Sequence, residues 1–440
     1  MDQQPYRKTR IVVVGGGAGG LELVRKLGVS FSKQKFDVIL VDRNSTHIWK
    51  PLLHEVAAGS LDANLDEVGY ASHAHRWGYR YFDGTLSAID REARQIVIAP
   101  ILGEDGTELV AEHRVGFDYL VLAMGSVSND FGTPGVRANC VFLDERAQAD
   151  RFRRLLLNQC LRVSRSLDRN PASDACVNVA IVGGGATGVE LAAELNSAAK
   201  SLASLGVDGF DSTRLHITLV EAGPRLLPAL TERLAESARS ALTKLNVRVL
   251  TSTQITEASP KGLRTSTGEM IESDLMVWAA GVKGADALHD IGGLKTTKRN
   301  HIEVLPTLQT TLDPHIYAIG DCAYFELADK RPVPPRAQAA HQMAATAFYN
   351  IRADLTGKPM TPFVYRDHGS LVSLSRNTAV GSLMGNLVGG RMAIQGRLAR
   401  FFYVSLYRMH LLAIHGWMKG TFLILIGHVN QIARPKLKLH

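Results

Sequence analysis

The chain has 440 residues, of which 45% are hydrophobic and 21% are charged. This length suits two or three domains, and the composition is that of a folded globular protein, which excludes a disordered or fibrous chain. The four cysteines lack metal-ligand spacing, so we expect reduced thiols and no metal site. The first ten residues are polar and lead directly into a strand pattern, so we expect no signal peptide and a cytoplasmic protein.

The net charge of +8 is unevenly distributed along the chain. No Asp or Glu follows Asp367, while nine Lys or Arg do, so the rest of the chain has a net charge of −1 (41 basic minus 42 acidic residues). A basic region confined to the C-terminus argues against a nucleic-acid-binding protein and favours an anionic phospholipid surface as a partner. The nine residues are Arg376, Arg391, Arg397, Arg400, Arg408, Lys419, Arg434, Lys436 and Lys438.

A glycine-rich motif occurs twice in the sequence. Residues 15–23 read GGGAGGLEL and follow the apolar run Ile11–Val14, which favours a buried strand. Residues 183–191 read GGGATGVEL and follow a similar run at Val177–Val182, with seven of nine positions identical. An internal repeat of this kind indicates two similar units. Helix-period segments follow the motifs at 21–27 and 189–199.

Each motif has the spacing of a dinucleotide-binding loop between a strand and a helix. The first glycine permits a tight turn, the second lets the backbone approach a pyrophosphate, and the third lets the helix pack close to the strand. An acid at the end of the next strand binds the ribose. The first set is Gly15, Gly17 and Gly20 with Asp42 after Phe36–Val41; the second is Gly183, Gly185 and Gly188 with Glu221 after Leu215–Val220.

The second acid also bears on the choice of nucleotide. Its spacing from the glycines is longer, because residues 200–213 are expected to form an inserted loop. A carboxylate here accepts from a free ribose 2′-hydroxyl and repels a 2′-phosphate, so Glu221 favours NADH over NADPH. Arg225 lies close in sequence and weakens this preference.

Three further segments extend the pattern, namely YLVLAMG at Tyr119–Gly125, LMVWAAG at Leu275–Gly281 and IYAIGD at Ile316–Asp321. With the glycine motifs, they make the chain resemble the flavoproteins with two dinucleotide-binding domains. This resemblance implies an α/β fold with two Rossmann-like domains, the NADH domain being inserted in the FAD domain. The expected domains are 1–125 and 281–390 for FAD, 126–280 for NADH, and 391–440 for a C-terminal amphipathic membrane-associating region.

The resemblance also assigns cofactor contacts. In this superfamily the aspartate of the GD motif hydrogen-bonds the ribityl chain of the flavin, a role that falls to Asp321; a turn aspartate capping the next helix is the alternative. Further FAD contacts are expected from Arg43, Lys50, Ala123, Gly125, Gly320, Gln338 and Ala339, and NADH contacts from Thr187, Glu190, Ala280 and Gly281.

The electron acceptor is indicated by other segments. Residues 47–59 contain no cysteine, which excludes the dithiol of disulfide reductases at that place. Cys160 and Cys176 lie far in sequence from the FAD motifs, which argues against a sulfide:quinone reductase. The stretches WKPLLHEVAAGSLD at 49–62 and PPRAQAAHQ at 334–342 resemble hallmarks of type II NADH:quinone oxidoreductases, in particular the single-subunit bacterial enzymes that use ubiquinone.

This second resemblance implies that NADH reduces FAD, which then passes two electrons to a membrane quinone. Gln338 and His341 are three residues apart and share a helix face, so Gln338 is expected to bond a quinone oxygen and His341 to supply a proton. Alternatively, both satisfy neighbouring backbone. Glu190 is the other candidate proton relay, although Glu22 at the equivalent place in the first motif shows that a glutamate there also suits the shared fold. The two protons are expected to pass through Glu190 or His341.

The C-terminal region is expected to reach the membrane without crossing it. No window holds the roughly 20 apolar residues of a spanning helix, so we expect electron transfer without proton translocation. Residues 396–418 predict a moderately amphipathic interfacial helix, followed by a second apolar segment and a basic end. A dimer interface or a core helix is the alternative for this segment. The charged side holds Arg397, Arg400, Arg408 and His415, and the apolar side holds Leu398, Phe402, Leu406 and Met409.

We therefore expect a homodimeric, peripheral enzyme on the cytoplasmic face of the inner membrane. Two other classes stay open. A soluble NADH oxidase or ferredoxin reductase would share the fold but would not need the acid-free tail. A redox sensor would bind FAD and NADH and signal through a partner.

Overall fold

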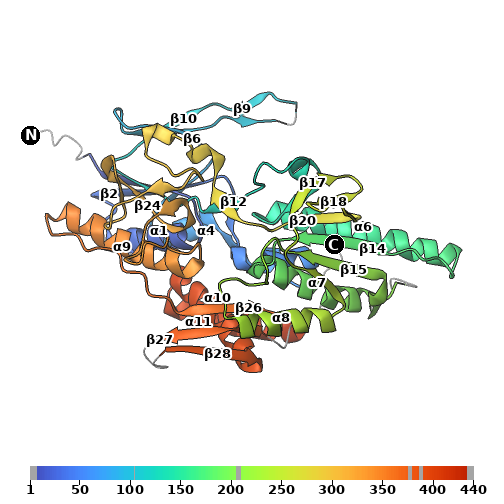
Figure 1. Cartoon of the computed structure of the whole chain (residues 1–440). Helices are drawn as coiled ribbons and strands as arrows, with labels where there is room; N and C mark the ends of the chain where they lie inside the picture. The colour runs from blue at the N-terminus through green and yellow to red at the C-terminus, as the bar shows by residue number, and fades with distance from the viewer. Residues whose placement is uncertain (1–6, 104, 205–209, 375–378, 386–389, 434–440) are drawn as a thin grey trace, which may run out of the picture. The chain divides into compact units, whose positions relative to one another are not determined.

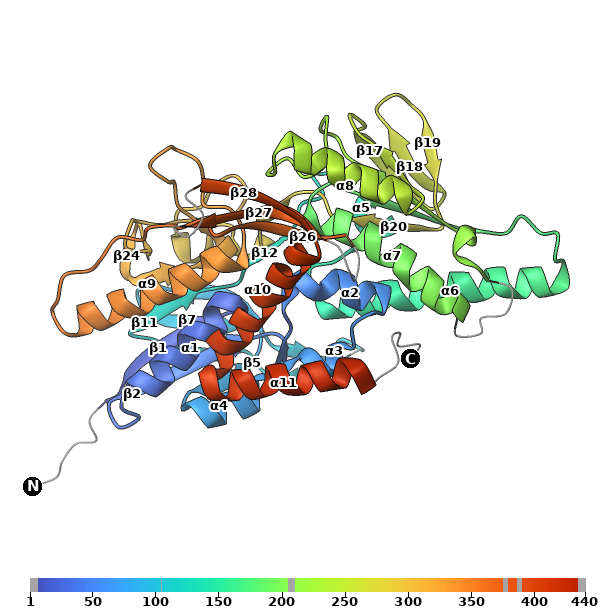
Figure 2. The same cartoon turned by 90° about the horizontal axis from the view of Figure 1, so that it is seen from below.

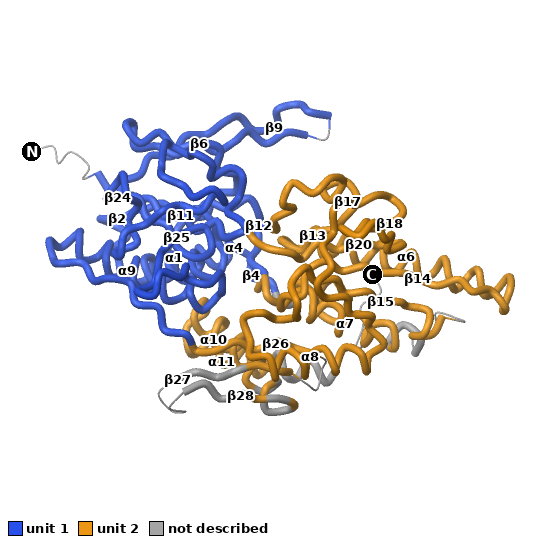
Figure 3. Tube along the Cα trace, in the orientation of Figure 1, with its two compact units in different colours: residues 1–48, 67–127, 283–367 blue, residues 49–66, 128–282, 368–440 orange. Residues whose placement is uncertain are grey.

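The computed structural model describes residues 7–103, 105–204, 210–374, 379–385 and 390–433. The chain divides into two compact units, which Figure 3 colours separately. Unit 1 comprises Met1–Ile48, Glu67–Val127 and Lys283–Asp367, and unit 2 comprises Trp49–Asp66, Ser128–Val282 and His368–His440. Unit 2 therefore contains the C-terminal region as well as the second glycine motif.

Unit 1 is built on a mostly parallel sheet (Figure 1). Its strands run in the order β23 (Gln309–Thr310), β24 (Asp313–Ala318), β11 (Tyr119–Leu122), β1 (Thr9–Val14), β2 (Phe36–Asp42) and β5 (Arg80–Asp83). β1 pairs in parallel with β2 on one side and with β11 on the other. This central place explains why the apolar run of β1 is continuous rather than alternating, since both of its faces are buried.

Two helices of unit 1 lie side by side, as Figure 2 shows. α1 (Ala18–Ser30) follows β1, and α9 (Ala337–Leu355) comes from more than 300 residues later in the chain. A Cβ added to Gly19 would lie 2.9 Å from the carbonyl oxygen of Ala340. The glycine therefore lets the two helix backbones approach closely.

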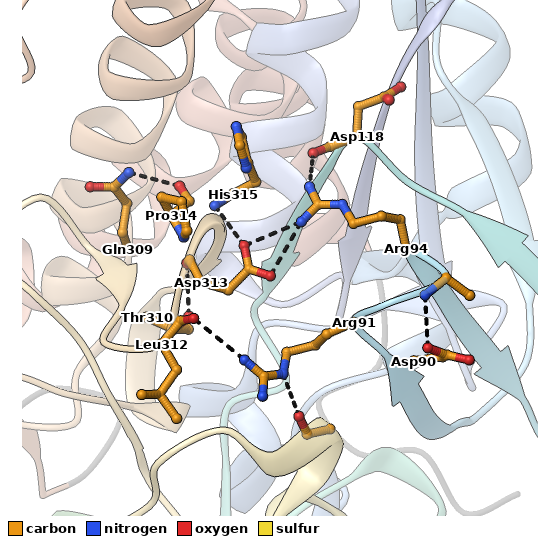
Figure 4. Close-up of polar contacts among 12 residues, drawn as sticks. Asp90, Arg91, Arg94, Asp118, Gln309, Thr310, Leu312, Asp313, Pro314 and His315 are labelled. Atoms are coloured by element: carbon orange, nitrogen blue, oxygen red, sulfur yellow. Dashed lines mark hydrogen bonds and ion pairs between the residues drawn. The ribbon is translucent and has the colours of Figure 1, made fainter.

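An antiparallel sheet of β6 (Leu86–Asp90), β7 (Gln95–Ile98) and β10 (His113–Gly116) is joined to the parallel sheet by two arginines. Arg94 donates from Nη1 to both carboxylate oxygens of Asp313 at 3.2 Å, and Arg94 Nη2 donates to the Asp118 carbonyl at 2.5 Å (Figure 4). Arg91 Nε donates to the Gly292 carbonyl at 2.6 Å. The carbonyls of Asp118 and Gly292 thus gain hydrogen-bond partners from the turn between β6 and β7.

The remaining elements of unit 1 are short. They are the strands β3 (Thr46–His47), β4 (Val68–Gly69), β8 (Ile101–Leu102), β9 (Glu108–Val110), β22 (Ile302–Glu303) and β25 (Ala323–Tyr324), the helix α4 (Tyr70–Trp77), and the 3₁₀ turns η3 (Asp286–Leu288), η4 (Ile291–Gly293) and η5 (Gly320–Cys322). Two further strands, β12 (Ser126–Ser128) and β21 (Val282–Gly284), lie where the chain passes from one unit to the other.

Unit 2 repeats the parallel arrangement. Its five-stranded sheet runs in the order β13 (Val141–Phe142), β20 (Leu275–Trp278), β14 (Val177–Val182), β15 (Leu215–Val220) and β16 (Val247–Leu250), with every pairing parallel. A small antiparallel sheet is formed by β17 (Ile255–Ser259), β18 (Gly262–Thr265) and β19 (Met270–Glu272). The helices are η1 (Lys50–Leu52), α2 (Leu53–Ala58), α3 (Ala63–Asp66), α5 (Val136–Asn139), α6 (Arg146–Arg169), α7 (Ala186–Ser204), η2 (Ser212–Arg214) and α8 (Glu232–Lys244).

The expected loop at residues 200–213 is wrong over its first part. α7 continues through Ser204, because the Ala-, Lys- and Leu-rich run after Ala198 consists of good helix formers. Residues 205–209 lie outside the described residues.

The C-terminal region forms a three-stranded antiparallel sheet and two helices, red in Figure 1. Its elements are β26 (Gly369–Ser373), β27 (Ala379–Gly385), β28 (Gly390–Gly396), α10 (Arg397–His415) and α11 (Trp417–Ala433). The helix expected at 396–418 is α10, which ends at His415 because Gly416, with φ +73°, has a conformation that favours glycine. The second apolar segment expected to follow it forms α11. Within the described part of the chain, no helix has the length and apolar character needed to span a bilayer.

Candidate functional site

The first glycine loop of unit 1 is shaped by close backbone contacts. Gly15 has φ +102°, and its N–H donates to the carbonyl of Val41 at 2.8 Å. A Cβ on Gly15 would lie 2.4 Å from the Ala123 carbonyl oxygen, and one on Gly20 would lie 1.9 Å from the Gly15 carbonyl oxygen. Both positions therefore exclude a side chain, because the loop packs closely against the neighbouring strand and the helix that follows it.

The acid at the end of β2 is hydrogen-bonded to this loop. Asp42 Oδ2 accepts from the Gly16 N–H at 2.6 Å, and Oδ1 accepts from the Asn44 N–H at 2.8 Å. Burial raises the pKa of Asp42 overall, although these two hydrogen bonds act to lower it. The Tyr70 hydroxyl donates to the Gly16 carbonyl at 2.8 Å. Among the described residues, no atom outside the loop and its own helix lies within 4 Å of a Cβ built on Gly17, so the second glycine faces open space.

Asp321 lies beyond the end of β24, beside the end of β11. Its Oδ2 accepts a hydrogen bond of 2.9 Å from the Ser126 hydroxyl. Gly320 and Gly125, which flank these residues, both have φ +70°. Asp321 therefore lies at the carboxyl edge of the parallel strands, which is the edge where ligands bind in sheets of this kind. Among the other expected FAD residues, Ala123 and Ala339 are buried and Arg43 is exposed.

The first two turns of α9 carry both of the residues expected to contact the quinone, Gln338 and His341. Gln338 Nε2 donates to Asp367 Oδ1 at 3.3 Å, and Arg336 Nη1 lies 3.3 Å from the same oxygen. His341 contacts Glu22 of α1 through its Nδ1. The sequence pattern did not predict this contact, because it depends on how α1 packs against α9.

The second glycine loop, in unit 2, repeats the first. Gly183 has φ +114° and donates to the Val220 carbonyl at 2.8 Å, while a Cβ on Gly188 would lie 2.0 Å from the Gly183 carbonyl oxygen. Glu221 Oε2 accepts from the Gly184 N–H at 2.6 Å. As beside Gly17, no atom lies within 4 Å of a Cβ on the second glycine, Gly185, and Thr187 is exposed beside it.

Gly223 and Arg225, which follow Glu221 in the sequence, bear on the choice between NADH and NADPH. The Gly223 N–H donates to Glu221 Oε1 at 2.7 Å, so both carboxylate oxygens are fixed by backbone. Arg225 Nη2 donates to the Pro228 carbonyl at 3.2 Å. The guanidinium that could attract a 2′-phosphate thus has a backbone partner of its own.

The exit of β20 holds the last expected NADH residues, Ala280 and Gly281. Gly281 has φ +62°, and a Cβ there would lie 2.5 Å from the Phe131 ring. The Gly281 carbonyl accepts from the Asn129 N–H at 3.2 Å, and the Asn129 carbonyl accepts from Trp278 Nε1 at 2.8 Å. This network fixes the turn after β20.

Glu190 is buried on α7, with 7% of its surface exposed. Its Oε1 accepts from the Ser373 backbone N–H at 2.9 Å, and its Oε2 lies 3.6 Å from His54 Nδ1. The sequence pattern did not predict His54 and Ser373 as partners of this carboxylate. Lys50, four residues before His54, lies 3.4 Å from Asp144 Oδ1, and its proposed flavin contact stays a prediction.

The cysteines do not form a redox centre among the described residues. None is in a disulfide, and no group of three or more described His, Cys, Asp or Glu side chains could hold a metal. Burial raises the pKa of the Cys160 thiol to about 12, so it stays protonated and unreactive. Cys160 therefore gives no support to the sulfide:quinone reductase alternative.

Comparison with known proteins agrees with this geometry. The family described as pyridine nucleotide-disulphide oxidoreductase matches residues 9–344, so the chain belongs to that family. The chain is 47% identical over 441 residues to the type II NADH:quinone oxidoreductase of Haemophilus influenzae, covering 98% of this chain and 99% of the relative. It is 28% identical to the Staphylococcus aureus enzyme of the same name, covering 88% of this chain and 92% of the relative.

The chain therefore belongs to the type II NADH:quinone oxidoreductases. As a member it is an FAD-dependent enzyme that oxidises NADH and reduces a quinone, which confirms the expected family, activity and cofactor. The solved structure of NDH2 from Plasmodium falciparum in complex with NADH has a TM-score of 0.79 at 20% identity, covering 98% of this chain and all of that one. This likeness confirms the fold class, with two Rossmann-like units.

Proposed function

We propose that this enzyme passes two electrons from NADH to ubiquinone at the surface of the inner membrane, without moving ions across it. The observation that carries the proposal is the repeated loop geometry. In each unit the acid of the following strand accepts from the second N–H of the glycine loop at 2.6 Å. Two dinucleotide loops of this kind suit one resident and one exchanging nucleotide.

We assign FAD to unit 1 and NADH to unit 2. FAD, when bound, supplies the two-electron chemistry between NADH and the quinone. Gly15, Gly17 and Gly20 would hold its pyrophosphate, and Asp42 and Asp321 its ribose and ribityl hydroxyls. In unit 2, Gly183, Gly185 and Gly188 would hold the NADH pyrophosphate, with Glu221 on the adenosine ribose.

For the quinone we propose the start of α9. Gln338 and His341 are three residues apart, which places them on one side of the helix. The Gln338 amide can donate to a quinone oxygen, and the His341 imidazole can supply a proton. Glu190 of unit 2 is the second proton relay that we propose. Its Oε2 lies 3.6 Å from Nδ1 of His54 in the same unit.

Attachment to the membrane is proposed through α11. Its exposed apolar side chains are spaced one, three or four residues apart, which places them on one side of the helix. Such a contiguous exposed face supports insertion into the lipid headgroup region, next to the basic C-terminal end. The apolar contact is thus proposed on α11, which begins at Trp417, rather than on α10 (Arg397–His415). The residues are Trp417 (76% exposed), Met418 (72%), Phe422 (61%), Leu425 (61%) and Ile426 (40%).

Two finer proposals follow the family resemblance, namely a homodimer and a location on the cytoplasmic face of the inner membrane. Light scattering of the purified flavoprotein tests the first. Protease access to inside-out and right-side-out membrane vesicles tests the second, because only inside-out vesicles should expose the enzyme.

The function is tested by steady-state NADH oxidation with a ubiquinone analogue, ferricyanide or dioxygen as the acceptor, with and without lipid. Quinone-dependent turnover that exceeds dioxygen-dependent turnover supports the proposal. Turnover with dioxygen alone would favour an NADH oxidase. Flavin reduction by NADH without turnover on any acceptor would favour a redox sensor.

A further inference from the structure

A carboxylate of unit 1 is enclosed between a lysine and a histidine. Only 9% of the Glu22 side chain is exposed, and its Oε1 lies 2.6 Å from Lys26 Nζ, one turn further along α1. Its Oε2 contacts His341 Nδ1 of α9, whose side chain is 21% exposed. None of the nucleotide contacts proposed above uses Glu22.

The packing of two helices creates this contact. Gly19 lets the backbone of α1 approach Ala340 of α9, with 2.9 Å between an added Cβ and the Ala340 carbonyl oxygen. Glu22 is three residues after Gly19 and faces the same side of α1, while His341 follows Ala340 directly. A glycine contact and a carboxylate–imidazole contact therefore lie one turn apart in the same helix pair.

The charges around the pair keep the carboxylate ionised. Burial raises the pKa of Glu22, but the hydrogen bond and charge of His341, and then those of Lys26, outweigh burial and lower the pKa overall. Arg25 also interacts electrostatically with Glu22. His47 interacts electrostatically with His341, and burial lowers the pKa of His47 to about 4, so His47 is uncharged at neutral pH. Glu22 is thus an anion that faces His341 at neutral pH.

We infer that Glu22 is a positioning residue that holds His341 by its Nδ1–H and directs the Nε2 atom to proton exchange with the quinone. This inference rests on the proposed function of His341. A carboxylate that accepts from one ring nitrogen fixes the tautomer and orientation of the imidazole, so the other nitrogen carries the exchangeable proton.

The proton step balances with the established activity. The hydride from NADH supplies two electrons and one proton, so the conversion of quinone to quinol needs one further proton from the medium. In the step that we assign, the N–H bond at His341 Nε2 breaks and an O–H bond forms on a quinone oxygen. The neutral imidazole then regains a proton from solvent, and Glu22 stays ionised throughout.

Ferricyanide separates this role from a structural one, because it takes electrons from a reduced flavin without taking protons. We expect Glu22→Gln to lower the ratio of ubiquinone-analogue to ferricyanide turnover at least tenfold, because a misdirected imidazole should lose part of the roughly 10²–10⁴-fold contribution of general acid catalysis. His341→Gln should lower the ratio similarly. The double variant should lose no more than His341→Gln alone, because Glu22 acts through His341.

The matched control is Asp37→Asn. Asp37 belongs to the same unit and pairs with two cations, Arg10 at 2.9 Å and Arg80 at 2.6 Å, neither of which is a residue of the proposed nucleotide or quinone sites. Its loss should change the ratio by less than twofold. Flavin content and the thermal unfolding midpoint of every variant show whether the fold is retained.

A measurement on the unmodified enzyme supports the test if Glu22→Gln does not fold. With ¹⁵N-labelled histidine, and with His341→Gln to assign its signal, neutral His341 should carry its proton on Nδ1. A proton on Nε2 alone would overturn the inference, as would a folded Glu22→Gln enzyme with an unchanged ratio, or single losses that multiply in the double variant. A wild-type enzyme that reduces ferricyanide but no quinone would instead refute the proposed function.

Discussion

Glu190 Oε1 accepts a hydrogen bond of 2.9 Å from the backbone N–H of Ser373, although 183 residues separate the two in sequence. Both residues are buried, with 7% and 4% of their surfaces exposed. The bond ties β26 of the C-terminal region to α7 of the nucleotide-binding part of unit 2. The repeat-equivalent Glu22 bonds a different partner, so the same motif position serves a different contact in each unit.

This bond predicts a difference between two substitutions of Glu190. Glu190→Leu leaves the buried Ser373 N–H without its acceptor, which should lower the free energy of unfolding by roughly 1–3 kcal/mol. Glu190→Gln keeps an acceptor oxygen and should cost less than about 1 kcal/mol. Urea denaturation of the two flavoproteins measures this. Glu236→Leu, at an exposed site on α8, is the control, and equal losses for both Glu190 variants would contradict the structural role.

A second prediction concerns flavin retention. Asp321→Ala removes the carboxylate beside Ser126, so the purified protein should contain little FAD and show little yellow colour. Ser126→Ala removes only the hydroxyl that donates to Asp321 and should retain most of its flavin, because the carboxylate remains. The absorbance spectrum and released FAD of both proteins measure this. Full flavin content in Asp321→Ala would refute its assigned role.

The sequence predicted the glycine loops and their acids well, because these features depend on local backbone geometry. Gly15, Gly183 and their partner strands lie where the repeat indicated. The contacts of Glu22 and Glu190 could not be predicted in this way, since helices and strands far away in sequence provide their partners.

The C-terminal region shows the same limit. Residue periodicity over 396–418 could not show that the chain turns at Gly416 and begins α11. Nor could it show which apolar side chains the protein itself covers. Among the described side chains, α10 has one large exposed hydrophobic residue, Met409, whereas α11 has five, beginning with Trp417.

A third prediction concerns nucleotide choice. In Glu221→Gln the negative charge that repels a 2′-phosphate is lost, while an oxygen can still accept from the Gly184 N–H. Hydrogen bonds to charged groups contribute roughly 1.5–3 kcal/mol, so the preference for NADH over NADPH, measured as the ratio of kcat/KM values, should fall by about 10- to 100-fold. Glu257→Gln, an exposed pair with Arg264, is the control. An unchanged ratio would count against the ribose role.

The fully buried His47 predicts a dependence of stability on pH. Burial lowers its pKa in the folded protein from 6.5 to about 4. As the pH falls through this interval, the unfolded chain binds a proton that folded His47 does not, so stability is lost, by roughly 3 kcal/mol at the lower end. His47→Gln should flatten this loss. Urea midpoints from pH 7 to pH 4 test it against exposed His289→Gln, and parallel curves for both variants would show that His47 does not cause the loss.

The last prediction concerns membrane attachment through α11. Trp417 and Phe422 have 76% and 61% of their surfaces exposed, so replacing both with Ser removes little packing within the protein. Full burial of one such side chain in an apolar environment contributes about 1.5–3 kcal/mol, so the double variant should bind anionic vesicles at least about tenfold more weakly. Its ferricyanide turnover should remain, since neither side chain belongs to a nucleotide loop.

Co-sedimentation with phosphatidylglycerol-containing vesicles measures the binding. The control is a double Ser variant of Leu109 and Val110 on β9, which are similarly exposed at 66% and 53% but belong to unit 1 and not to the C-terminal region. If exposed apolar surface of any kind caused the binding, both double variants would be released to the same extent. Release of the α11 variant alone places the membrane contact on that helix, whereas unchanged sedimentation of that variant would exclude α11 as the anchor.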